Sequence, residues 1–185
     1  IVGFLKPDAG SILLAGADIT NLSMYRRAQE GIGYLPQETS IFRGLTVEEN
    51  ISAVLEIHGL GSAERNARVG QLLEELRLQD RAKQRAETLS GGEVRRVEIA
   101  RALAVDVRYL LLDEPFTGID PRTAEDIQGI ISHLTDKGLG VLITDHSVRE
   151  TLRITRRAYI MADGQILTEG TARELTEDDT VRRRY

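Results

Sequence analysis

The sequence predicts an α/β fold in which a parallel sheet is interrupted by an inserted helical subdomain. Short apolar runs next to glycine or proline alternate with segments whose apolar residues recur every three or four positions, as in strands and helices respectively. This alternation is typical of a parallel sheet covered on both faces. The chain has 185 residues, of which 41% are hydrophobic, a size that suits one core with a small appended unit.

The first half of the chain is predicted to contain two short strands followed by two amphipathic helices. Residues 12–15 and 32–35 are the predicted strands. Between Thr46 and Gly59 apolar residues lie at helical spacing, and Thr46 with Glu49 matches a capping box. The second helix is predicted from four apolar residues at helical spacing, which are Val69, Leu72, Leu73 and Leu76.

The second half is predicted to alternate between buried strands and helices. A charged connector, residues 79–87, leads to a glycine turn and a helix. Apolar runs at 107–112 and 139–143 predict strands, each followed by a helix. The expected organisation is one partial domain over residues 1–185, with an α/β core at 1–36 and 105–185 and the helical subdomain at 46–104.

Composition narrows the classes of protein to which the chain can belong. No segment approaches the roughly 18 consecutive apolar residues of a membrane helix, so we expect a soluble chain. The absence of cysteine agrees with a reducing cytoplasm. The net charge of −5 argues against nucleic-acid binding, and a small basic cluster at residues 182–184 is expected to be solvated.

The glycine turn, residues 88–93, is a candidate phosphate-binding site. It places Ser90, Gly91 and Gly92 at the start of a helix. Backbone N–H groups and the helix dipole favour an anion at this position by about 0.3–1 kcal/mol. The Ser90 hydroxyl can add a charge-assisted hydrogen bond.

Two adjacent carboxylates, Asp113 and Glu114, follow the apolar run 107–112. Ligands of open α/β sheets bind beyond the carboxyl ends of the strands. Asp113 is therefore a candidate to hold Mg²⁺, and Glu114 a candidate to orient and deprotonate an attacking water. The alternative is an acid pair that only caps the next helix, but the glycine turn upstream favours the catalytic interpretation.

His146 follows the second buried strand and is expected at the same sheet edge as the acid pair. An imidazole in that place can donate to a phosphate group and hold the geometry of the attacking water. His58 and His133 lack this context. We interpret them as ordinary surface or core residues.

Three segments, residues 89–103, 110–121 and 142–150, resemble the ATPase subunits of ABC transporters, which are P-loop NTPases. The resemblance covers essentially the whole chain, and the motifs occur in the order of the family. It implies binding of ATP and Mg²⁺, and ATP hydrolysis coupled to transport. It also implies a homodimer with a second ATPase subunit and membrane association only through transmembrane subunits, with no nucleic-acid partner.

The resemblance assigns the nucleotide contacts to five residues. Gln37 lies in the loop that contacts magnesium and senses the nucleotide. Ser90, Gly91 and Gly92 match the signature motif, which contacts the γ-phosphate of ATP held by the opposite subunit. Asp120 matches the loop that communicates across the dimer.

The resemblance also assigns the metal and the chemistry. Asp113 matches the Walker B aspartate, which with Gln37 serves the magnesium ion. Glu114 matches the catalytic glutamate and His146 the switch histidine. One departure is Glu93, which stands where many members carry glutamine.

The Gly-x-x-x-x-Gly-Lys-Ser/Thr loop of the family does not occur in these residues. We therefore expect the N-terminal part of the cassette to be missing, and residues 1–10 to resemble the tail of the helix that follows that loop. These residues alone are expected not to hold ATP in their own site and to be inactive. One interpretation is therefore that the chain only supplies the signature motif to a partner subunit and has no ATP site of its own.

Residues 34–43, 95–101 and 140–152 resemble the ATPases of lipopolysaccharide export systems, which work at the cytoplasmic face of the inner membrane. The alternatives are a cassette of a branched-chain amino-acid importer and a soluble non-transport ABC ATPase. The stretch between Gln37 and Ser90 leaves no room for the long coiled coil of DNA-repair and chromosome members.

Phe42 and Arg43 lie where cassettes of this family receive their membrane partner. An aromatic side chain is a typical anchor of an interface. The alternative is that Phe42 packs inside the helical subdomain.

Overall fold

A parallel sheet of three strands lies at the centre of the structure. The strands are β3 (Ile32–Leu35), β4 (Tyr109–Asp113) and β5 (Gly140–Thr144), in the order β3-β4-β5. The register aligns Leu35 with Leu112 and Asp113 with Thr144. The predicted α/β fold with a parallel sheet is confirmed, and the ends of all three strands meet at one edge.

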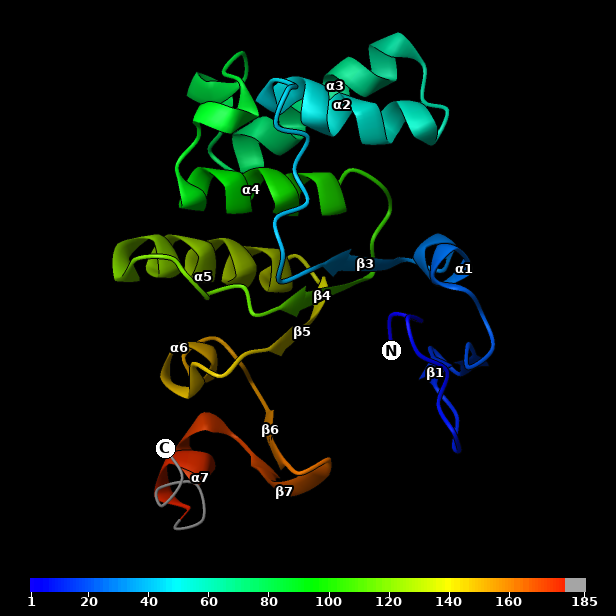
Figure 1. The fold of residues 1–185 in the computed structure, drawn as a ribbon, viewed down its shortest axis with the longest axis vertical. Coiled ribbons are helices and arrows are strands. Elements are labelled where there is room, and N and C mark those ends of the chain that lie inside the picture. The colour runs from blue at the N-terminus through cyan, green and yellow to red at the C-terminus, as the bar shows by residue number, and fades with distance from the viewer. Residues whose placement is uncertain (179–185) are drawn as a thin grey trace.

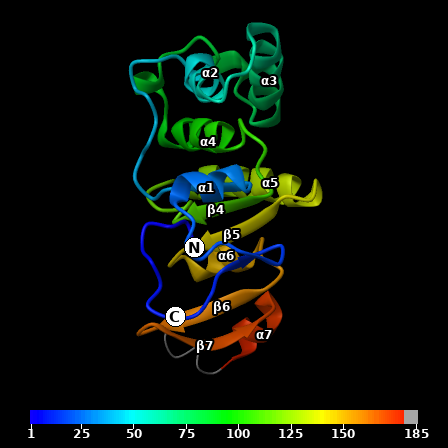
Figure 2. The same ribbon diagram turned by 90° about the vertical axis from the view of Figure 1, so that its right-hand side faces the viewer.

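The computed structural model describes residues 1–178 (Figure 1). The basic cluster predicted at 182–184 lies outside them. The helices α2, α3 and α4 lie at one end of the molecule, the sheet is in the middle, and a β-hairpin lies at the other end (Figure 2).

The helical subdomain consists of α2 (Val47–Ile57), α3 (Ser62–Glu75) and α4 (Gly91–Ala102). Two short 3₁₀ turns, Gln79–Arg81 and Ala86–Thr88, form the connector before α4. The predicted capping box of α2 is present. Apolar side chains of the three helices pack into one core together with the sheet and α5 (Pro121–Asp136).

Alternate residues of β4 serve two different cores. Leu110 and Leu112 are buried against α4 and α5. Leu111 points the other way and packs with Ile19 and Ile32 in a smaller cluster. Apolar residues on both sides of a strand are typical of a parallel strand covered on both faces. β4 is therefore held rigidly just before its terminal carboxylates.

The N-terminal part differs from the prediction. The strand expected at 12–15 is only β1 (Leu13–Leu14), paired with β2 (Ala17–Asp18), and a short helix α1 (Met24–Gln29) was not predicted. Residues 1–10 contain no helix, so the expected helix tail is wrong. Gly3 and Gly10 have φ of 105° and 84°, which a right-handed helix cannot accommodate.

The C-terminal part contains α6 (Val148–Leu152), the antiparallel strands β6 (Ala158–Ala162) and β7 (Gln165–Gly170), and α7 (Ala172–Glu177). The hairpin was not predicted. Its two-residue turn, Asp163-Gly164, has positive φ at both positions, and Asp-Gly is a strong signal for such a turn. Within residues 1–178 no helix is long and apolar enough to cross a membrane.

Candidate functional site

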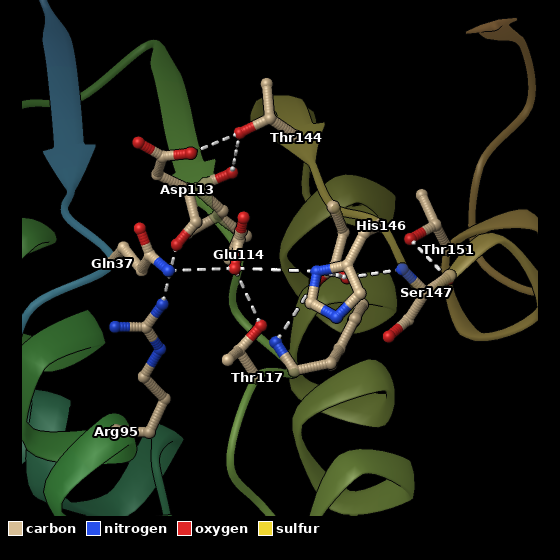
Figure 3. Close-up of polar contacts among 12 residues, drawn as sticks. Gln37, Arg95, Asp113, Glu114, Thr117, Thr144, His146, Ser147 and Thr151 are labelled. Carbon is tan, nitrogen blue, oxygen red and sulfur yellow. Dashed lines mark hydrogen bonds and ion pairs between the residues drawn. The ribbon is translucent and has the colours of Figure 1, made fainter.

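Asp113 ends β4 with both carboxylate oxygens in contact with neighbouring strands. The Tyr34 hydroxyl donates to Oδ2 at 3.1 Å and the Thr144 hydroxyl donates to Oδ1 at 2.6 Å (Figure 3 shows the latter). Burial and the bond to Asp113 raise the pKa of Tyr34, so the phenol stays a donor. The carboxylate is therefore oriented from both sides.

Glu114 adopts an unusual backbone conformation. Its φ is 44°, a left-handed value that is rare for a residue with a side chain. The backbone N–H of Glu114 donates to the Thr144 carbonyl at 2.7 Å, which holds this conformation. Oε2 accepts from Gln37 Nε2 and from the Thr117 hydroxyl, each at 2.9 Å (Figure 3). Strained residues of this kind gather at functional sites.

His146 lies beside the acid pair, as its position after β5 predicts. Its Nδ1 is 3.5 Å from Glu114 Oε2, and its side chain is 67% exposed. The side chain of the neighbouring Asp145 is fully buried and accepts from the backbone N–H groups of Phe116 at 3.3 Å and Ser147 at 2.7 Å. Asp145 thus fixes the loop and lies 3.8 Å from His146 Nδ1, while the exposed part of the imidazole can meet a ligand.

Arg95 of α4 connects the loop that contains Gln37 to the acid pair Asp113 and Glu114. Its guanidinium donates to the carbonyls of Pro36 at 2.9 Å and Asp113 at 3.1 Å. It also forms a buried ion pair with Glu98 at 3.1 Å. Removal of one member of a buried pair leaves an uncompensated charge. The backbone before Gln37 and the backbone of Asp113 are therefore held by one side chain.

The glycine turn begins α4 with a capping box, which was not predicted. The Ser90 hydroxyl accepts from the Glu93 N–H at 3.4 Å, and Glu93 Oε2 accepts from the Ser90 N–H at 2.8 Å. The other oxygen of Glu93 accepts from Arg81 Nε at 2.7 Å. This hydrogen bond with Arg81, and those with Ser90, lower the pKa of Glu93 to about 2.

Asp120 does not contact the acid pair. It is the N-cap of α5 and accepts from the N–H and hydroxyl of Thr123, at 3.1 and 2.5 Å. These bonds with Thr123 lower the pKa of Asp120. Thr123 also explains one glycine of the turn, because a Cβ on Gly92 would overlap its methyl group.

One groove joins the two candidate parts of the site. A cavity of about 370 Å³ is lined by Gln37, Glu114 and Thr117 on one side and by Gly91 at the start of α4. Arg43 lines the same cavity. The structure therefore brings Gln37, Glu114 and His146 together. Gly91 of the glycine turn lines the cavity beside Gln37 and Glu114, whereas Ser90, Gly92 and His146 are not among its lining residues.

Phe42 is not a core residue, because it is 44% exposed. Its backbone N–H donates to Asn50 Oδ1 at 2.9 Å, and its carbonyl accepts from Asn50 Nδ2 at 3.0 Å. The Arg101 guanidinium lies 4.3 Å from the ring centroid. A fixed backbone and an exposed ring form a suitable contact for a partner.

The residues present fit a Mg²⁺ ion that is shared with a nucleotide. The described part of the chain holds no group of three or more His, Asp or Glu that could bind a metal by itself. Mg²⁺ commonly takes one or two carboxylates and completes its shell with phosphates and water. Asp113 retains acceptor capacity beyond its two hydrogen bonds, so it can serve as that ligand with Gln37 near it.

Several residues of the site were missed at the level of the sequence. Thr117 and Asp145 lie inside segments already singled out, so their proximity to Glu114 and His146 was the available signal. Tyr34, Thr144 and Arg95 also lie inside segments already singled out, but their contacts with the site depend on the sheet register and the packing of α4. No local pattern indicates such contacts.

Comparisons with known proteins show to which family the chain is similar. Residues 1–117 match the family model described as ABC transporter. An uncharacterized ABC transporter ATP-binding protein of Rhizobium meliloti is 54% identical over the whole chain, which spans 68% of that protein. The lipopolysaccharide export system ATP-binding protein LptB of Escherichia coli is 50% identical over the whole chain, which spans 77% of it.

A similar solved structure contains an ATP-binding cassette as a dimer. The dimeric post-hydrolysis state of the ATP-binding cassette MJ0796, bound to ADP and Pi, is 26% identical with a TM-score of 0.79. The match covers 93% of this chain and 77% of that one. The similarity thus extends over both the helical subdomain and the sheet.

Proposed function

Because the chain belongs to the ABC transporter family of ATP-binding proteins, we propose that it hydrolyses ATP to drive lipopolysaccharide export across the inner membrane. One observation carries the proposed chemistry. Glu114 directly follows Asp113 in a strained conformation, and its carboxylate lies among Gln37, Thr117 and His146.

Glu114 is the proposed general base. In the full-length protein it accepts a proton from a water that attacks the γ-phosphorus, and the bond to the β,γ-bridging oxygen breaks. Gln37 and Thr117 donate to the same carboxylate oxygen, which orients it before reaction. The His146 imidazole, whose Nδ1 lies 3.5 Å from that oxygen, donates to the γ-phosphate and so helps to keep the attacking water in line.

Asp113, with Gln37, is the proposed holder of Mg²⁺, which when bound neutralises developing charge on the phosphates. Tyr34 and Thr144 fix the carboxylate for this task. Asp120, at the start of α5, is the proposed contact across a homodimer. Ser90, Gly91 and Gly92 are proposed to bind the γ-phosphate held by the second subunit.

The proposed location is the cytoplasmic face of the inner membrane, with transmembrane subunits docked at Phe42 and Arg43. Support comes from the exposure of Phe42 and from Arg43 in the wall of the groove that holds Glu114. Movement at the nucleotide site would then be felt at the docking surface.

The identity of the cargo is tested by reconstitution of the full-length protein with its transmembrane subunits in vesicles. We expect ATP-dependent extraction of lipopolysaccharide and no uptake of branched-chain amino acids. Uptake of amino acids would replace the proposed cargo, and ATP hydrolysis with movement of neither substrate would favour a soluble ATPase. Glu114→Gln is the inactive control.

The docking surface is tested with Phe42→Ala in the full-length protein. Loss of a ring that fills a pocket costs about 2 kcal/mol or more in binding, so recovery of the transmembrane subunits in a pull-down should fall about 30-fold. The ATPase rate of the free cassette should change far less. Ile57→Ala, which removes an 81% exposed side chain of α2, is the matched control, and equal recovery for both variants would contradict the proposal.

A further inference from the structure

Glu93 places a carboxylate against the phosphate-binding turn. Its Oε2 lies 2.8 Å from both the N–H and the hydroxyl oxygen of Ser90. The hydroxyl therefore donates its proton to Glu93 in this structure. The Glu93 side chain is only 16% exposed, so its negative charge acts at close range on any group bound at the turn.

This arrangement conflicts with phosphate binding in two ways. The Ser90 hydroxyl has one proton, so it cannot donate to Glu93 and to a phosphate oxygen at the same time. A carboxylate beside a phosphate is also repulsive. Binding of a phosphate thus requires that Glu93 be neutralised and held by something other than Ser90.

Arg81 is placed to do both. Its Nε donates to Glu93 Oε1, the oxygen that faces away from Ser90, at 2.7 Å. Its backbone is anchored, because the Arg81 N–H donates at 3.0 Å to the carbonyl of the fully buried Leu78. Other cations of the connector do not reach the turn: Lys83 pairs with Glu48 and Arg85 with Glu87 at the exposed surface.

We propose that Arg81 is a positioning residue for the phosphate-binding turn: it neutralises and holds Glu93, so that the Ser90 hydroxyl can turn from Glu93 to the γ-phosphate of ATP. This inference rests on the proposed function, because it takes the phosphate role of Ser90 as given. Arg81 itself touches no nucleotide. It acts through Glu93 alone, so its effect disappears when Glu93 carries no charge.

The test is a double-mutant cycle in the full-length protein, read as kcat and KM for ATP. Arg81→Gln should raise KM about 5- to 30-fold, the size expected for loss of one partly buried ion pair. It should change kcat less. Glu93→Gln in the Arg81→Gln background should bring KM back to within about 3-fold of the Glu93→Gln single variant. Arg81→Lys, which keeps the charge, should rescue most of the loss.

Lys83→Gln is the matched control, since it removes a connector cation whose side chain is 83% exposed. Arg81→Gln that behaves like Lys83→Gln overturns the inference, as does a KM defect that Glu93→Gln does not relieve. If Arg81→Gln fails to fold, KM is compared between Arg81→Lys and the double variant Arg81→Lys with Glu93→Gln. A KM defect of Arg81→Lys that Glu93→Gln does not relieve then overturns the inference. A parent without ATPase activity refutes the proposed function and this inference together, whereas an active parent impaired by Ser90→Ala but not by Arg81→Gln refutes only the inference.

Discussion

The two candidate parts of the site, the sheet edge and the glycine turn, are built in different ways. At the sheet edge, Asp113 and Glu114 are held by Tyr34, Gln37 and Thr144, all distant in the sequence. At the glycine turn, Ser90 and Glu93 hold each other within one helical turn.

Because of this difference, mutations in the two parts should have different effects on stability and on activity. A change at the sheet edge removes a reacting group from a frame that stays intact, because β4 is buried on both faces. A change at the turn removes a helix cap, so it alters the stability of α4 together with ligand binding. Mutations can therefore distinguish the two parts.

The largest effect is expected for Glu114→Gln. Loss of a general base typically lowers the rate by about 10²–10⁴-fold, while the amide keeps the shape of the side chain. Steady-state ATPase assays of the full-length protein should show this loss, with ATP binding and ATP-driven dimerisation retained. Glu64→Gln, an exposed change on α3, serves as control, and normal turnover by Glu114→Gln would refute its assignment as the base.

Leu112→Ala tests the frame beneath the sheet edge. Leu112 is 1% exposed and precedes Asp113, so its truncation leaves a cavity and should lower the free energy of unfolding by about 2–5 kcal/mol. Urea unfolding measures this change. A loss below about 1 kcal/mol would show that the edge does not depend on the packing of β4.

Ser90→Ala should have a smaller effect on stability. The substitution removes the N-cap of α4, with a cost of about 1 kcal/mol, and the same unfolding experiment detects it. Thr171→Ala removes the equivalent capping box of α7 and is the matched control. If Ser90→Ala weakens ATP affinity and Thr171→Ala does not, the turn has a role beyond capping.

The smallest effect is a dependence of stability on pH from Glu93. Its pKa is lowered from 4.5 to about 2 in the folded state, so its stabilising contribution is fully present above pH 4.5 and is lost as the pH falls toward 2. After allowance for screening we expect about 1 kcal/mol. The free energy of unfolding should differ less between pH 3 and pH 6 for Arg81→Gln than for the parent. An equal difference in the two proteins would contradict the assigned role of the Arg81–Glu93 ion pair.

The elements with a strong local pattern were predicted well. The strand at 32–35 and the capped helix after Thr46 match β3 and α2. The hairpin of β6 and β7 was missed although Asp163-Gly164 marks its turn. The expectation that residues 1–10 form a helix tail was wrong, because Gly3 and Gly10 adopt positive φ, which a right-handed helix does not accommodate.

The sequence by itself determined which residues are candidates for the chemistry and where α2 begins. The choice of Asp113 and Glu114, and the cap at Thr46, follow from neighbours only a few positions away. Only the tertiary structure decided which partners those residues have. The contacts of Glu114 with Gln37 and of Asp113 with Tyr34 arise from the register of parallel strands, which depends on burial across the whole sheet and leaves no trace in a local pattern.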